Sequence, residues 1–247
     1  MKLAGLFLAL MLLLLSTPAF SADKTLVAAA DPYPPFVDPD NAKQGLSLEI
    51  ARAAFATQGY DVKLEIMPWA RAETGVVDGV YDILPNVWMT DARKKVLFYS
   101  EPYATNVVKF MKRVDDAFEF QGLDSLKGKT IGTVRGYGYG SEFLNADSFT
   151  REEANALDVN VNKLIAGRID LTLEDEIVAK AQITHQDPTL LEKVAFTENA
   201  LSRNDLHIAS GLKNPRHQEI IDAFNKGLAE IKNNGVYQQI MSSYGVQ

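Results

Sequence analysis

Short apolar segments with the pattern of buried strands alternate with helix-patterned segments, and this alternation begins twice along the chain. In the first series, residues 25–30, 62–66 and 81–84 are predicted strands, and residues 47–58 and 70–77 are predicted helices. Alternation of this kind favours an α/β fold with largely parallel sheets and helices on the sheet faces.

The second series follows an extended apolar segment at residues 105–112. It contains predicted strands at 130–134 and 169–173 and predicted helices at 159–166 and 176–182. A chain of 247 residues can hold two lobes of roughly 100 residues each. Strand ends and helix N-termini converge between two such lobes, so a ligand cleft is expected there.

A final amphipathic helix is predicted to follow Asn214, which would cap it, with Pro215 at its first position. Ile220, Phe224, Leu228 and Ile231 form its apolar stripe before Gly235.

The N-terminal residues 1–21 are predicted to be a signal peptide. Lys2 precedes an apolar run over residues 3–15, and the small-residue stretch 16–22 places the cleavage after Ser21. The run is shorter than the roughly 20 apolar residues of a spanning helix, so no stable membrane insertion is expected. The absence of cysteine from the sequence argues against lipid anchoring and excludes disulfides.

Composition and spacing exclude several functions. A net charge of −7 without basic clusters argues against nucleic acid as a partner. His185, His207 and His217 do not stand at metal-ligand spacing, so no metal and no cofactor are expected. Neither Ser100 nor Ser141 lies in a nucleophile elbow, so no catalytic residue is expected.

Four stretches carry a family resemblance, and they stand at residues 31–36, 81–103, 126–136 and 166–176. In this order, behind a signal peptide, they resemble the bacterial periplasmic solute-binding proteins of polar amino-acid uptake, family 3 of the extracellular solute-binding proteins. The resemblance implies a two-lobed α/β binding-protein fold, each lobe a mostly parallel sheet flanked by helices, with a ligand cleft at the hinge.

The same resemblance implies the domain organisation and the partners. Residues 22–108 and 206–247 would form lobe 1, and residues 109–205 would form lobe 2, with the two hinge crossings at its ends. The protein would be a periplasmic monomer that delivers a small polar solute, an amino acid or a derivative, to the membrane permease of an ABC transporter.

The family's ligand contacts map onto residues of both lobes. Arg93 matches the arginine that holds the ligand carboxylate, which suits its planar fork of donors. Asp175 matches the acid that receives the ligand ammonium, and Tyr33 and Trp69 would flank the aliphatic part of the ligand.

The chain departs from the family pattern at two positions. Trp88 stands where many members have a small hydroxyl residue, and Gly138 stands in a glycine-rich loop where a hydroxyl residue is common; glycine there permits an anion-binding nest of backbone amides. The full expected ligand-binding set is Arg93, Asp175, Tyr33, Trp69, Asn86, Trp88, Thr90, Gly136, Tyr137 and Gly138.

Structural roles compete with these assignments. Arg93 could be a helix-start residue paired with Asp91, Asp175 could be an exposed carboxylate at a helix N-terminus, and Trp69 could be a core indole.

Two other functions also compete. The first is a soluble sensor whose closed form docks on a membrane receptor. The second is an exported enzyme on the same scaffold, of the small-molecule dehydratase type, which would need an acid of raised pKa in the cleft; Glu174, Asp175 and Glu176 are the candidates.

Overall fold

The computed structural model describes residues 24–245, and the predicted signal peptide lies outside this range. The strands are β1 (Thr25–Ala30), β2 (Asp61–Ile66), β3 (Leu84–Trp88), β4 (Leu97–Tyr99), β5 (Ala104–Arg113), β6 (Thr130–Val134), β7 (Thr150–Ala154), β8 (Leu171–Asp175) and β9 (Val194–Gly211). The α-helices are α2 (Leu46–Thr57), α3 (Trp69–Val77), α4 (Ser141–Asn145), α5 (Leu157–Ile165), α6 (Glu176–Gln186), α7 (His217–Asn233) and α8 (Val236–Ser243).

The sheets of this fold combine parallel and antiparallel strand pairs. β1 pairs with β2, and β6 pairs with β7 and β8, in the parallel manner that strand–helix alternation predicts. The long strands β5 and β9 pair with each other in antiparallel fashion and add β3, β4 and β8 as antiparallel neighbours. The two-lobed α/β architecture is confirmed, with an antiparallel ladder between its parallel parts.

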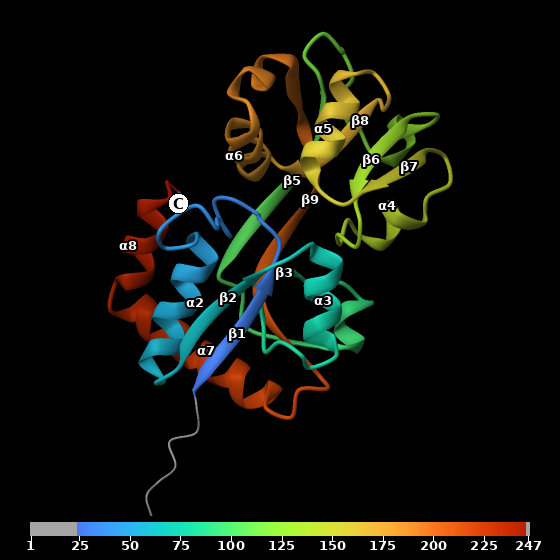
Figure 1. Cartoon of the computed structure of the whole chain (residues 1–247). Coiled ribbons are helices and arrows are strands. Elements are labelled where there is room, and N and C mark those ends of the chain that lie inside the picture. The colour runs from blue at the N-terminus through green and yellow to red at the C-terminus, as the bar shows by residue number, and fades with distance from the viewer. Residues whose placement is uncertain (1–23, 246–247) are drawn as a thin grey trace, which may run out of the picture.

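β5 and β9 connect the two lobes side by side (Figure 1). β3 and β4 extend this sheet in one lobe, and β8, β6 and β7 extend it in the other. The predicted domain boundaries at residues 108 and 206 fall within β5 and β9. Because both strands are continuous there, these limits stay a prediction.

Helix α7 closes the core of the first lobe, as its apolar stripe predicts. Ile220, Phe224, Leu228 and Ile231 are each at most 2% exposed. The ring of Phe224 packs against that of Phe55 on α2, with their centroids 5.5 Å apart. Burial of each such side chain contributes roughly 1.5–3 kcal/mol, which fixes α7 against α2.

Several predicted elements were wrong by a few residues at their ends; the strand predicted at residues 169–173, for example, is β8 at Leu171–Asp175. The strand predicted at residues 81–84 is β3 at Leu84–Trp88, because Tyr81 and Asp82 belong to the turn that follows α3. Helix α7 begins at His217 and not at Pro215: the side chain of Asn214 accepts the backbone N–H of Arg216 in a turn that precedes the helix. Within residues 24–245, no helix is long and apolar enough to cross a membrane.

Candidate functional site

A small pocket lies between the two lobes, with about 280 Å³ of space free of protein atoms, part of which is open solvent at its mouth. Its lining consists of Asp31, Tyr33, Trp69, Asn86, Trp88, Arg93, Tyr137, Gly138 and Leu206. Seven of these nine residues belong to the set predicted from the sequence, and Asp31 and Leu206 are additions.

Arg93 is buried, and protein groups occupy most of its donors. Its Nε donates to Glu73 Oε1 at 2.8 Å, and its Nη2 donates to Glu73 Oε2 at 3.3 Å and to the carbonyl of Gly136 at 2.8 Å. Its Nη1 donates to the carbonyl of Trp88 at 3.1 Å. Four of the five guanidinium N–H donors are therefore satisfied, and the positive charge is matched by Glu73.

The pairing with Asp91 that was weighed for Arg93 from the sequence does not form. Asp91 pairs with Lys94 at 3.4 Å and not with Arg93. A ligand carboxylate would have to compete with the side chain of Glu73. Glu73 stands one helical turn after Trp69 on α3, and its Oε2 accepts from Trp69 Nε1 at 2.9 Å; the guanidinium lies 4.8 Å from the centre of the Trp69 ring.

Aromatic rings from both lobes surround the cavity. The ring of Tyr137, from the second lobe, meets the rings of Tyr33, Trp69 and Trp88 edge to face, with centroid distances of 6.2, 6.0 and 5.9 Å. Trp88 is 6% exposed, and its Nε1 donates to Asn106 Oδ1 at 2.9 Å. The rings of Tyr33, Trp69 and Trp88 therefore line the cavity, with Tyr137 at their centre.

Two buried acids receive hydroxyl groups from the opposite lobe. Tyr137 donates to Asp31 Oδ2 at 2.7 Å, and Tyr33 donates to Glu174 Oε1 at 2.8 Å. Burial raises the pKa of Asp31 to about 6 and that of Glu174 to about 8. These bonds, together with those to the Gly136 carbonyl, join the lobes in a closed arrangement.

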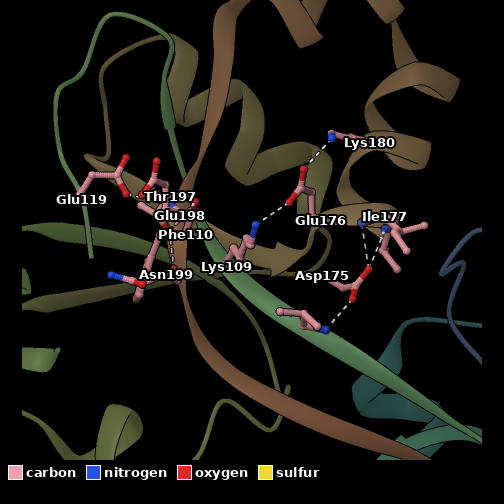
Figure 2. A network of polar contacts seen from close by, with 12 residues as sticks. Lys109, Phe110, Glu119, Asp175, Glu176, Ile177, Lys180, Thr197, Glu198 and Asn199 are labelled. Carbon is pink, nitrogen blue, oxygen red and sulfur yellow. Dashed lines mark hydrogen bonds and ion pairs between the residues drawn. The ribbon is translucent and has the colours of Figure 1, made fainter. Parts of the chain in front are cut away.

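Asp175 lies outside the cavity lining, and its carboxylate has structural partners. Oδ1 accepts the backbone N–H groups of Ile177 and Val178 at the start of α6, and Oδ2 accepts the N–H of Val107 on β5 at 2.8 Å. Figure 2 shows Asp175 at this helix start, beside Glu176, which lies between Lys109 and Lys180. In this structure the helix-terminus alternative describes Asp175, which is buried and not exposed.

Thr90 and the glycine-rich loop hold Arg93 in place. The Thr90 hydroxyl accepts the backbone N–H of Arg93 at 3.2 Å, and Thr90 does not line the cavity. Gly136, at φ +78°, presents its carbonyl to Arg93 and to Trp69 Nε1. At Gly138 an added Cβ would lie 2.8 Å from Thr90 Cγ2, so the close approach of the two lobes requires glycine there.

Three acids of the site were not assigned to ligand binding from the sequence. Glu73 could have been found from its place four residues after Trp69, in the first turn of the helix predicted at residues 70–77, and Asp31 from its place at the carboxyl end of β1. Glu174 was considered only as a catalytic acid. Among residues 24–245, no group of three or more His, Asp or Glu side chains is arranged to hold a metal ion.

Two lobes joined by a pair of strands, with a small cavity lined from both sides, define a binding protein that closes on a small solute. The family model of the bacterial extracellular solute-binding proteins, family 3, matches residues 26–247, and the chain belongs to this family.

Relatives and solved structures agree with this assignment. The chain is 25% identical over 229 residues to the arginine-binding extracellular protein ArtP of Bacillus subtilis, covering 90% of this chain and 86% of ArtP. It is 27% identical over 223 residues to the arginine-binding periplasmic protein of Mannheimia haemolytica, covering 86% and 87%. The amino acid ABC transporter substrate-binding protein AbpA of Streptococcus pneumoniae, bound to L-arginine, has the same fold with a TM-score of 0.75 and 21% identity, covering 90% of this chain and 94% of AbpA.

Proposed function

We propose that this protein is an exported, monomeric solute receptor that binds an amino acid or a close derivative in the cavity between its lobes and delivers it to the membrane permease of an ABC transporter. The observation that carries the proposal is the cavity itself, to which both lobes contribute side chains. The names of the relatives, which bind arginine outside the cytoplasm, support the solute class and a periplasmic location.

A solute in this cavity would stabilise the closed arrangement of the lobes. Tyr33, Trp69, Asn86, Trp88 and Arg93 come from the first lobe, whereas Tyr137 and Gly138 come from the second. A solute that contacts both groups binds the closed state more tightly than the open one, and so shifts the population toward closure. A permease can distinguish the two states by their shape.

The enzyme alternative has weaker support. It requires an acid of raised pKa, and Glu174 meets that requirement. However, a general acid must come within hydrogen-bonding reach of its substrate, and Glu174 is fully buried, does not line the cavity and bonds to the Tyr33 hydroxyl. We therefore assign Glu174 to the closed structure and propose no catalytic residue.

The test measures the thermal midpoint of unfolding with and without each compound of a panel of amino acids, small peptides, polyamines, sugars and carboxylates. The protein is first unfolded and refolded to remove bound solute. At about 100 times its dissociation constant, a ligand stabilises the folded state by about 2.7 kcal/mol. Tyr137→Ala should abolish the shift, whereas Tyr237→Ala should retain it. Both tyrosines are half-buried, but Tyr237 is remote from the cavity lining and donates to the carbonyl of Tyr103.

A shift by an amino acid or a derivative that disappears only in the cavity variant supports the proposal. No shift with any member of the panel, or equal loss in both variants, contradicts it. Scattering measurements on the same samples would show whether the bound solute makes the particle more compact.

A further inference from the structure

A buried acid of the second lobe has no cationic partner. Glu174, next to the end of β8, is fully buried. Its Oε1 accepts the Tyr33 hydroxyl at 2.8 Å and the backbone N–H of Asp175 at 2.9 Å, whereas its Oε2 has no hydrogen-bond partner within residues 24–245. A charge buried without a counter-ion costs far more free energy than a buried neutral group. The closed structure therefore favours the protonated carboxyl, with the proton on Oε2.

The cations on the elements that pack against β8 are bound to other acids. Lys109 on β5 and Lys180 on α6 both bind Glu176, at 2.9 and 2.6 Å. Lys163 on α5 binds Glu152 at 3.1 Å, and β6 carries no ionisable side chain. None of these ammonium groups is directed to the buried carboxyl, so a proton is what neutralises it.

The first lobe completes the burial of Glu174. Tyr33 follows β1 in the first lobe and reaches Glu174 across the space between the lobes. Burial first, and the charge of Glu174 second, raise the pKa of the Tyr33 and Tyr139 hydroxyls well above their usual range, so all three groups share one site without water. Two nearby acids, Asp31 and Asp175, add negative charge there. When the lobes part, the Tyr33 bond must break and water can hydrate the carboxylate.

We infer that closure of the lobes on a solute takes up one proton from water at Glu174, so that solute affinity rises as the surroundings become more acidic. This inference rests on the proposed function and adds a regulation to the same site. The direction follows from linkage: a carboxyl whose pKa is higher in the closed state than in the open one stabilises closure at low pH, and this stabilisation is lost as pH rises through the closed-state value.

The size of the effect follows from the same burial. The pKa of Glu174 is about 8 in the closed structure, mainly because of burial, against 4.5 for a hydrated side chain. At pH 7, closure should therefore take up about 0.9 proton at this residue. Asp31, whose pKa burial raises to about 6, would add only about 0.1 proton at that pH. Solute affinity should fall about tenfold or more between pH 6 and pH 8.

Calorimetric titration in two buffers counts the protons. The refolded protein is titrated at pH 7 in phosphate and in Tris, whose heats of ionisation differ, first with L-arginine and then with whichever amino acid gives the largest thermal shift. Glu174→Gln keeps an acceptor for Tyr33 and cannot take up the proton. We expect its uptake to be about 0.9 proton lower than that of the parent protein, and its affinity to change much less with pH. The difference isolates this residue, because the solute titrates alike in both proteins.

An exposed ion pair between the lobes supplies the control. His185 Nε2 on α6 lies 3.4 Å from Asp40 Oδ2 of the first lobe, and this pair also depends on pH. His185→Gln should keep the proton uptake of the parent protein. A second variant of the site, Tyr33→Phe, removes a hydrogen bond that stabilises the charged form of Glu174, so the fall in affinity should move to higher pH.

The outcomes separate the inference from the proposed function. Equal uptake in the parent protein and in folded Glu174→Gln, or loss of the uptake in His185→Gln, overturns the inference while solute binding stands. If Glu174→Gln does not fold, as a thermal melt would show, a fall in affinity that stays in place or moves to lower pH in Tyr33→Phe overturns it. If no amino acid binds, the inference and the proposed function both fail.

Discussion

Replacement of Asp175 by alanine removes a carboxylate that accepts hydrogen bonds at two places. One oxygen caps α6 through Ile177 and Val178, and the other accepts the N–H of Val107 on the connecting strand β5. Loss of an N-cap costs typically about 1 kcal/mol. A half-buried N–H that loses its acceptor adds about 1–2 kcal/mol, the lower part of the range for buried donors. The free energy of unfolding should therefore fall by about 2–3 kcal/mol, the sum of these two losses.

Urea denaturation followed by circular dichroism measures this loss. Asp175→Ser is the informative control, because serine caps helices well but is too short to retain both contacts; it should recover about 1 kcal/mol. A decrease below about 0.5 kcal/mol in Asp175→Ala, the size of an ordinary surface substitution, would refute the reasoning. If solute affinity instead collapsed with stability unchanged, the ammonium-binding role implied by the family resemblance would be supported.

Three further changes follow from the site. Burial raises the pKa of Glu174 from its ordinary value of 4.5 to about 8 in the folded chain, so between these pH values the folded state binds more protons than the unfolded state. The free energy of unfolding should therefore fall as pH rises from about 4.5 to 8. Glu174→Gln should flatten this slope in urea titrations at several pH values. Gly138→Ala should weaken solute binding about tenfold or more in calorimetric titrations, because its Cβ would collide with Thr90 across the closed lobes. Trp88→Phe leaves Asn106 Oδ1 buried without its donor, so the free energy of unfolding should fall by about 1–3 kcal/mol and the thermal midpoint should fall with it. A midpoint within about 1 °C of the parent, roughly the error of a melt, would contradict this.

The sequence predicts the order of strands and helices and most of the cavity lining. Tyr33, Trp69 and Trp88 lie where local pattern and family resemblance place them. Local sequence patterns predict helices and strands because the spacing of apolar residues follows the face of each element that packs on the core. The antiparallel ladder of β5 and β9 was not foreseen, since the pairing of Ala104 with Leu206 joins residues about a hundred positions apart.

The electrostatic character of the cavity could not be predicted in the same way. The roles of Arg93 and Asp175 were inferred from residue type and family position, but the ionic partners of a side chain depend on which groups the tertiary fold brings within hydrogen-bonding distance. Glu73 reaches Arg93 from a different helix, and Val107 reaches Asp175 from a different strand. Burial of Glu174 likewise depends on the closure of both lobes, which no local pattern encodes.

The pairing of β3 with β9, and the packing of α2 on α7, also have a consequence for the order in which the lobes can fold. Both contacts join the early part of the chain to segments beyond residue 194. Contacts of such large sequence separation form slowly, because loop-closure entropy is lost before they are made. The first lobe therefore cannot complete its core until β9 and α7 have docked on it, whereas β6, β7 and β8 lie close in sequence and can assemble earlier. During refolding, the N-terminal half of the protein should be the last part to become protected from hydrogen exchange.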